Sequence, residues 1–209
     1  MTSLVPFSRP GPPARRYRSE PDSRPVPHWG FPEIRRLVET IRETHRPPRG
    51  DQYALLVMTL FDGALRIGEA LGIAPRDLIR SAEGYRVRVE GKTGWREAAI
   101  SPNLAERLRG YAWDQKLALD VRYWPFSPSR AHEVISEAEQ AAGLVKPVGV
   151  GAVHILRHSG AIERMRITGD PKAVQDQLGH TTAGMTLRYM KTLLQEEGIA
   201  RQEKVDYQW

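Results

Sequence analysis

Apolar residues recur at helical spacing along most of this chain, and the pattern predicts a largely helical fold. A first helix is expected from about Phe31, with Pro32 in its first turn and an apolar face made of Ile34, Leu37, Val38 and Ile41. Residues 45–50, which hold two prolines and a glycine, should end this helix. Residues 53–61 are apolar on nearly all sides and follow Asp51, a suitable N-cap, so they predict a buried central helix.

Turn and capping residues divide the remaining helical pattern into shorter segments. Helices are expected from about Leu65 and then over residues 102–111, 129–142, 154–167, 171–178 and 182–189. The small pair Gly160-Ala161 should let another helix approach closely, and Gly169 and Gly179 should end the helices that precede them. A last segment, 193–209, is long enough for one more helix.

Strict alternation of apolar and polar residues occurs in one place, residues 85–89. Gly91-Lys92-Thr93-Gly94 has the composition of a turn, and residues 95–100 are expected to return as a second strand. The predicted fold class is therefore α+β and mainly α, with one small antiparallel β-sheet.

The first thirty residues differ in composition from the rest. Residues 1–27 hold seven of the sixteen prolines and five arginines, against two acidic residues. Such a segment buries too little apolar surface to offset its ordering entropy, so residues 1–30 are expected to form a disordered basic tail and 31–209 the folded domain. The tail could follow a phosphate backbone, or it could be an inert leader.

Composition narrows the class of protein. Lysine and arginine number 31 against 25 acidic residues, a net charge of +6 that is compatible with nucleic acid as a partner. The absence of cysteine excludes disulfides, zinc–thiolate sites and thiol catalysis. The longest apolar run, residues 54–61, is too short to span a bilayer, so a soluble cytoplasmic protein with no membrane partner is expected.

The residue types that carry chemistry gather in the last third of the chain, in the order His154, Arg157, His180 and Tyr189. His154 and Arg157 lie three residues apart and so share a helix face near an N-terminus, where free N–H groups favour an anion. Arginine binds phosphate oxygens, histidine moves protons and a tyrosine hydroxyl can attack, a combination that indicates covalent chemistry on a phosphodiester.

Two other interpretations of these residues fail. Gly91-Lys92-Thr93 resembles the end of a phosphate-binding loop, but position 86 is Arg where that loop requires glycine, and the segment joins two strands. His154 and His158 have metal-ligand spacing, but Ile155 stands where a zinc protease needs glutamate. No metal site or cofactor is expected.

Together these residues resemble the tyrosine recombinase (phage integrase) family over roughly residues 31–195. The resemblance rests on motifs in a fixed order: Ala64–Leu71 with Arg66 and Glu69, Gly91–Arg96 with Lys92, His154-x-x-Arg157, His180, and Tyr189 with Thr186 three residues before it. It implies the family's helical catalytic domain, carried here by residues 31–209.

The resemblance also implies a role for each motif residue. Arg66 and Arg157 would hold the nonbridging oxygens of the scissile phosphate, because the guanidinium is bidentate and always charged. His180 would donate a hydrogen bond to the phosphoryl transition state, and Lys92 would protonate the leaving 5′ oxygen. Tyr189 would attack the phosphorus.

The two remaining residues would support this chemistry. His154 would serve proton transfer around the nucleophile, and Glu69 would lie behind Arg66 or His154 and orient it. The 3′-phosphotyrosyl link would conserve the bond energy, so no ATP or metal would be required.

The implied function is site-specific DNA recombination on double-stranded DNA, by a tetramer assembled on paired sites. The alternatives are relaxation of DNA by a type IB topoisomerase and a noncatalytic DNA-binding regulator on the same fold. Most family members carry a helical domain before the catalytic one, whereas about 30 residues precede the first predicted helix here. The chain is therefore either a short family member or a fragment, and an accessory DNA-binding protein is a possible partner. In relatives the C-terminal tail docks on a neighbouring protomer.

Overall fold

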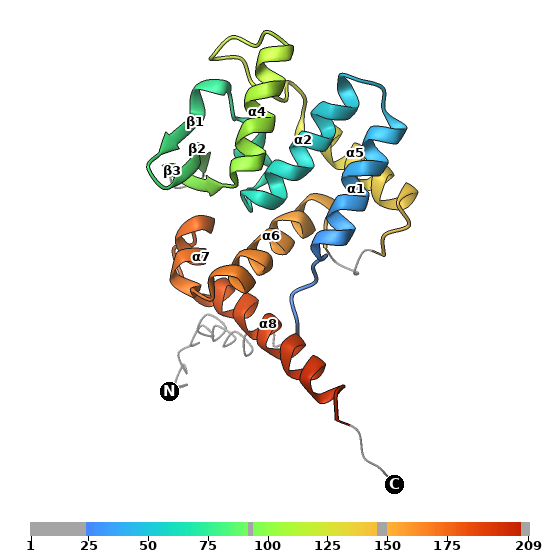
Figure 1. The fold of residues 1–209 in the computed structure, drawn as a ribbon, viewed down its shortest axis with the longest axis vertical. Coiled ribbons are helices and arrows are strands. Elements are labelled where there is room, and N and C mark those ends of the chain that lie inside the picture. The colour runs from blue at the N-terminus through green and yellow to red at the C-terminus, as the bar shows by residue number, and fades with distance from the viewer. Residues whose placement is uncertain (1–23, 92–93, 146–149, 206–209) are drawn as a thin grey trace, which may run out of the picture.

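The computed structural model describes residues 24–91, 94–145 and 150–205 (Figure 1). Within these ranges the elements are α1 (Phe31–Thr44), α2 (Arg49–Asp62), α3 (Ile67–Leu71), a 3₁₀ turn η1 (Pro75–Asp77), β1 (Leu78–Ser81), β2 (Gly84–Gly91), β3 (Gly94–Ile100), α4 (Pro102–Asp114), α5 (Pro128–Ala141), α6 (Ala152–Thr168), α7 (Pro171–Leu178) and α8 (Gly184–Gln202). The predicted class, mainly helical with a small antiparallel sheet, is confirmed.

The sheet is an antiparallel meander of order β1-β2-β3. Val87 of β2 pairs with Ala98 of β3, and these two side chains, with Val89, are buried against the helices, whereas Arg88 is exposed. The alternation at residues 85–89 therefore predicted this strand. β1 was not predicted, because its four residues, Leu78–Ser81, show no clear burial alternation.

Helix α2 lies at the centre of the main core, as its apolar sequence predicted. It begins at Arg49 rather than after Asp51, so the carboxylate of Asp51 lies in the first turn instead of capping the helix. Gly160 of α6 faces α2 so closely that a Cβ there would lie 1.9 Å from the carbonyl oxygen of Phe61. The expectation that a small residue in this segment permits close helix packing is confirmed.

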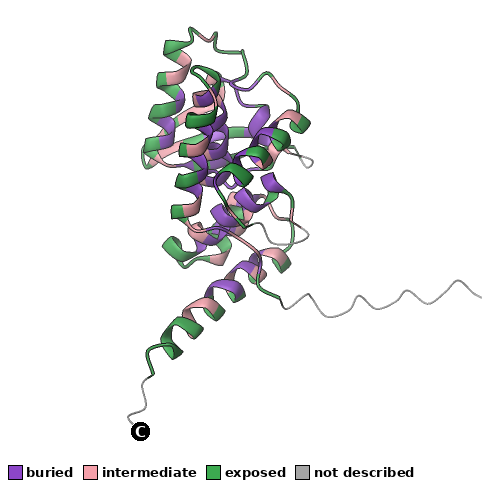
Figure 2. Ribbon diagram, turned by 90° about the vertical axis from the view of Figure 1, so that its right-hand side faces the viewer, coloured by how far each residue is buried: buried purple, intermediate pink, exposed green. Residues whose placement is uncertain are grey.

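A second, smaller core joins the C-terminal helices. Tyr189 and Leu193 of α8 pack there with Ala161 and Ile162 of α6 and with Leu178 of α7. Helix α8 is longer than predicted, because one continuous helix covers both the expected 182–189 segment and the start of the expected 193–209 segment. Its C-terminal part projects from the body and is mostly exposed (Figure 2).

The described chain begins with an extended segment, residues 24–30, that lies against α6 and α8. The backbone N–H of Val26 donates to Thr192 Oγ1 (2.9 Å), and that of Trp29 donates to Ser159 Oγ (2.8 Å). Both Val26 and Trp29 are buried. Order therefore starts before the predicted boundary at residue 31, because these two apolar side chains have core positions to fill; residues 1–23 of the expected tail lie outside the described residues. Across the described ranges, none of the helices has the length and apolar character needed to cross a membrane.

Candidate active site

Arg66 is placed by a tight turn between α2 and α3. The turn puts Ala64 at φ 49°, a left-handed conformation that costs energy for a residue with a Cβ and that often occurs at functional sites. Arg66 is the N-cap residue of α3, and Glu69 in the first turn accepts a hydrogen bond from its backbone N–H (2.8 Å) and another from its Nη1 (3.0 Å). Both the backbone and the guanidinium of Arg66 are thereby fixed.

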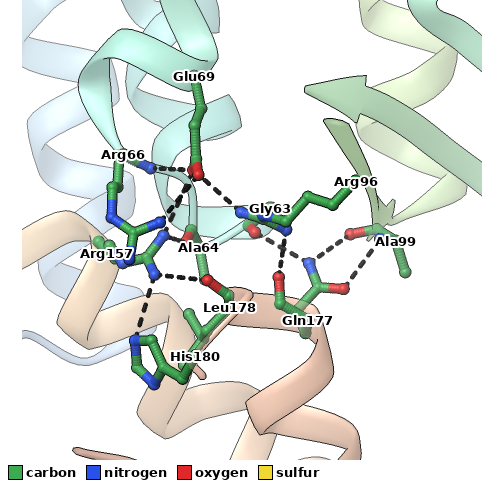
Figure 3. Close-up of polar contacts among 10 residues, drawn as sticks. All are labelled: Gly63, Ala64, Arg66, Glu69, Arg96, Ala99, Arg157, Gln177, Leu178 and His180. Atoms are coloured by element: carbon green, nitrogen blue, oxygen red, sulfur yellow. Dashed lines mark hydrogen bonds and ion pairs between the residues drawn. The ribbon is translucent and has the colours of Figure 1, made fainter. Parts of the chain in front are cut away.

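Glu69 is the anionic centre of an arginine cluster (Figure 3). Its buried carboxylate pairs with Arg66 (3.0 Å), with Arg96 of β3 (2.9 Å) and with Arg157 of α6 (3.5 Å). Burial alone would raise the pKa of Glu69, but the hydrogen bond from the Arg66 backbone and the charges of Arg96 and Arg157 bring it below its ordinary value. The carboxylate therefore stays ionised and holds three cations together.

Arg157 is buried and anchored to the backbone of two other elements. Its Nη1 donates to the Ala64 carbonyl (2.7 Å) and its Nη2 to the Leu178 carbonyl (2.9 Å). Burial and the nearby charge of Arg66 lower the pKa of Arg157 to about 10, so the group is still protonated at neutral pH. Through these two hydrogen bonds, Arg157 connects the α2–α3 turn to the C-terminal end of α7.

Arg96 and Gln177 connect the sheet to this cluster, and neither was a predicted site residue. The Arg96 guanidinium reaches both Glu69 and the Gln177 carbonyl, while the Gln177 side-chain amide bonds Gly63 and Ala99. Arg96 belongs to the lysine motif of residues 91–96, which was the one sequence signal that could have identified it. Lys92 of the same motif lies outside the described residues.

His180 follows the left-handed Gly179 that ends α7, as the sequence predicted. Its Nε2 lies 3.4 Å from Arg157 Nη2 and must accept this hydrogen bond, since arginine has no acceptor. Its Nδ1 lies 3.3 Å from the Thr186 hydroxyl. Burial and the charges of Arg157, Arg66 and Arg96 lower the pKa of His180 to about 4, so the imidazole is neutral at neutral pH.

Tyr189 lies in the second core with its side chain 1% exposed. Its ring stacks on His180 at a centroid distance of 6.4 Å, and its hydroxyl lies 2.8 Å from Nδ1 of His158. Burial raises the pKa of Tyr189 above its ordinary value, although nearby arginines oppose the shift, so the phenol is protonated at neutral pH. Sequence reasoning considered His158 only as a metal ligand and missed this contact.

His154 lies on the exposed side of α6, one turn before His158, and the two rings meet edge to face at 5.0 Å. Burial, the charges of Arg157 and Arg66, and His132 lower the pKa of His154. Together with Arg66 and Arg157 it lines a cavity of about 340 Å³ that extends to Gly91, the first residue of the lysine motif. Tyr189 and His180 are absent from the residues that line it. The structure therefore gathers four predicted residues around one cavity: Arg66, Glu69, His154 and Arg157.

The chain is similar to known proteins over most of its length. Residues 31–196 match the model of the phage integrase family. The tyrosine recombinase XerC of Methylobacterium sp. (strain 4-46) is 30% identical over 146 residues, and XerC of Agrobacterium fabrum is 26% identical over 187 residues. These alignments cover 66% and 84% of this chain but 45% and 57% of the relatives, so the chain spans about half the length of the curated relatives it matches.

Solved structures share the fold. The recombinase XerH bound to its difH substrate superposes with a TM-score of 0.67 at 20% identity, over 83% of this chain and 53% of that one. The catalytic domain of bacteriophage HP1 integrase gives a TM-score of 0.60 at 21% identity, over 85% of this chain and 94% of that domain. The fold agrees with the family match at residues 31–196, and the chain belongs to the phage integrase family.

Proposed function

We propose that this protein is a tyrosine-type, site-specific DNA recombinase that cleaves and rejoins duplex DNA through a 3′-phosphotyrosyl intermediate at Tyr189. The observation that carries the proposal is the cavity flanked by Arg66, His154 and Arg157, next to which Tyr189 is held by two further histidines. The family match and the half-length coverage of the relatives are consistent with a catalytic domain.

The arginines would bind the scissile phosphate in different ways. The Arg66 side chain is 42% exposed and would meet an incoming phosphate, whereas the Arg157 side chain is 4% exposed and is held by two carbonyl groups. A fixed cation costs little reorganisation when charge develops on the phosphoryl oxygens. His180 would donate to the same oxygens through Nε2. To do so it must give up its contact with Arg157, and its proton must move from Nδ1 to Nε2, because Nε2 accepts a hydrogen bond in this state.

In the chemical step the Tyr189 oxygen forms a bond to phosphorus while the bond from phosphorus to the 5′ oxygen breaks. His154 takes up the phenolic proton, and Lys92 donates a proton to the leaving 5′ oxygen. Attack of a 5′ hydroxyl on the phosphotyrosine reverses these steps and rejoins the strands. The linkage keeps the bond energy, so the proposed reaction uses no nucleotide, metal or other cofactor.

The proposed partners are double-stranded DNA and further copies of this chain, arranged as a tetramer on paired sites. Solved relatives with DNA include XerH on difH and a lambda integrase dimer on a COC′ core site. The projecting end of α8 exposes Leu194 and Ile199, and Val205 just after the helix is exposed as well, a feature that supports docking on a neighbouring protomer. An accessory DNA-binding protein and a cytoplasmic location belong to the same proposal.

Trapping of a covalent adduct tests the proposal. Nicked duplexes tiled across the DNA that flanks the gene are incubated with the protein in EDTA, so that release of the nicked strand prevents religation. Wild type should form a protein–DNA adduct, as should Tyr111→Phe, whereas Tyr189→Phe should bind DNA and form none. An adduct that persists in Tyr189→Phe, or maps to Tyr53, Tyr85, Tyr111 or Tyr207, contradicts the assignment.

The same preparation separates the alternative functions. A recombinase should relax supercoiled plasmid without a cognate site only feebly. Robust, sequence-independent relaxation by the monomer would establish the topoisomerase function instead. Tight DNA binding with no adduct on any duplex would establish a noncatalytic regulator.

A further inference from the structure

The proposed roles of the site residues do not account for one contact of Tyr189, the proposed nucleophile. The Tyr189 hydroxyl lies 2.8 Å from His158 Nδ1, and the two residues belong to α8 and α6, which pack against each other in the second core. The His158 ring lies between its neighbours, 5.0 Å from the ring of His154 and 5.7 Å from that of Tyr189. The cavity lined by Arg66, His154 and Arg157 is the proposed phosphate site and is called the phosphate cavity below. His158 therefore connects this cavity to the buried phenol.

The burial of His158 and the charges around it determine how this hydrogen bond is oriented. The groups that face it are His154, Arg157, Arg188 and His180, and after burial itself they lower the pKa of His158 to about 4. The imidazole is therefore neutral at neutral pH and has one nitrogen free to accept. A phenol is a better donor than acceptor, so we assign the O–H of Tyr189 as donor and Nδ1 of His158 as acceptor.

Burial of both groups argues against a transfer of the phenolic proton to His158 in this state. The pKa of His158 is about 4, whereas burial holds that of Tyr189 above its ordinary value of 10.0. A proton moves poorly from so weak an acid to so weak a base. The contact therefore orients the hydroxyl without ionising it.

We propose that His158 is a positioning residue for the nucleophile: its Nδ1 accepts the hydrogen bond of the Tyr189 hydroxyl and, with the stacked His180 ring, fixes the phenol beside the phosphate cavity before attack. This inference rests on the proposed function of Tyr189. The hydroxyl is buried, so loss of the acceptor leaves it unpaired and free to turn toward other partners. Ordering of the phenol before DNA arrives removes part of the entropic barrier to the attack.

Two replacements of different chemistry separate positioning from proton transfer. Asn places its Oδ1 close to where the imidazole has Nδ1 and can hydrogen-bond the phenol, but it cannot take up a proton. Phe keeps the ring and its volume but offers no acceptor. The expected order of cleavage rates is therefore wild type, then His158→Asn within about threefold, then His158→Phe slower by about three- to tenfold, the worth of one neutral hydrogen bond.

The experiment measures single-turnover formation of the Tyr189 adduct on a nicked cognate duplex, with enzyme in excess and over a range of pH. His45→Phe, in the turn between α1 and α2, serves as the control for a histidine-to-phenylalanine change, and thermal melting checks that each variant folds. Equal loss in His158→Asn and His158→Phe would make His158 the proton acceptor and overturn the positioning role. A His158→Phe rate equal to or above wild type would overturn it as well.

A second measurement does not depend on cleavage. Tyrosine labelled with ¹³C at Cζ reports hydrogen bonding of each phenol by NMR, and the resonance that Tyr189→Phe removes from the seven tyrosines belongs to Tyr189. In DNA-free protein, that resonance should shift in His158→Phe and stay near its wild-type position in His158→Asn. No shift in His158→Phe would show that the contact is absent, whether or not wild type cleaves DNA. Failure of wild type to form any adduct, with this shift present, would instead overturn the proposed function.

Discussion

Glu69 shows how one buried carboxylate organises the candidate site. Three guanidinium groups from α6, β3 and the start of α3 lie within 3.5 Å of it. Without the carboxylate these cations would repel one another inside a region largely shielded from water, where charge interactions are strong. Glu69 therefore determines both the stability of the cluster and the direction in which Arg66 presents its charge.

Glu69→Gln should remove the charge and keep the shape. We expect a loss of about 3 kcal/mol in the free energy of unfolding by urea, because a buried charge cluster loses its only anion among the pairs described, and a fall of about 10- to 100-fold in adduct formation. Glu97→Gln, which breaks the exposed pair with Arg86, is the control and should cost less than about 1 kcal/mol. Equal losses in both variants would contradict the role of Glu69.

The neutral histidines make the folded state sensitive to acid. The pKa values of His158 and His180 are about 4 in the folded protein, against 6.5 for an ordinary histidine. Between these values the unfolded chain takes up protons that the folded chain does not. Stability should therefore fall as pH drops from about 6.5 toward 4, by about 1–2 kcal/mol per histidine at pH 5, and should not depend on these groups above 6.5.

Thermal melting as a function of pH checks this expectation. The Tm of wild type should fall between pH 7 and 5, by roughly 2–4 °C for each kcal/mol lost. His158→Asn removes one of these titrating histidines and should show a shallower fall over the same range. Parallel curves for the two proteins would show that His158 is not held neutral by its surroundings.

At the scale of residues, the sequence predicted which residues form the site but only some of the contacts between them. Arg66, His154 and Arg157 do surround one cavity, and Glu69 does contact Arg66. The contact of Arg96 with Glu69 and that of His158 with Tyr189 join residues 27 and 31 positions apart. Local periodicity cannot report such pairs, because they depend on how β3 and α8 pack against other elements.

At the scale of elements, the helix pair α2–α6 positions the site. Arg157 and Gly160 occupy successive turns of α6, and the close approach at Gly160 brings α6 against the end of α2, where Ala64 accepts the Arg157 hydrogen bond. The geometry of the arginine thus depends on a residue without a side chain. Any separation of the two helices would lengthen the bond between Arg157 and Ala64.

Gly160→Ala should therefore destabilise the fold and weaken the site. The added Cβ would lie 1.9 Å from the Phe61 carbonyl oxygen, so the helices must move apart; we expect a cost of about 3 kcal/mol in urea unfolding. Gly110→Ala in α4 is the matched control, because a Cβ there meets nothing within 4 Å, and it should stabilise by up to about 1 kcal/mol. If both replacements stabilise the protein, the close approach is not a constraint.

Apolar spacing and capping residues predicted most of the helices and strands, and the features that they did not predict have physical reasons. Asp170 and Gly179 bound α7 as predicted, because cap chemistry is local. The length of α8 was not predicted, because Leu193 is held by the second core and not by the helix's own pattern. The short strand β1 gains its order from pairing with β2, a contact that its own four residues do not indicate.

At the scale of the molecule, residues 24–30 connect the N-terminal part of the chain to the helix that carries Tyr189. Val26 packs in the second core and bonds Thr192, one turn beyond the tyrosine, while His28 pairs with Glu196 further along α8 at 3.5 Å. A deletion through residue 27 would therefore remove packing as well as positive charge. A test of DNA binding by the basic segment must stop at residue 23.

Two truncations separate the effect of the positive charge in residues 1–23 from the effect of the packing of residues 24–30. Residues 1–23 carry Arg9, Arg15, Arg16 and Arg18, and each phosphate contact adds about 0.9 to the slope of log affinity against log salt. Deletion of residues 1–23 should flatten that slope by about two to three units in a filter-binding titration, with the Tm unchanged. Deletion of residues 1–30 should also lower the Tm and slow adduct formation, because Val26 and Trp29 no longer support α8 and α6.

Replacement of the four arginines by glutamine in the full chain is the control, and it should reproduce the effect of the shorter deletion on the slope. If neither the replacement nor the shorter deletion changes the slope, the folded domain supplies all of the DNA contacts and the segment is an inert leader.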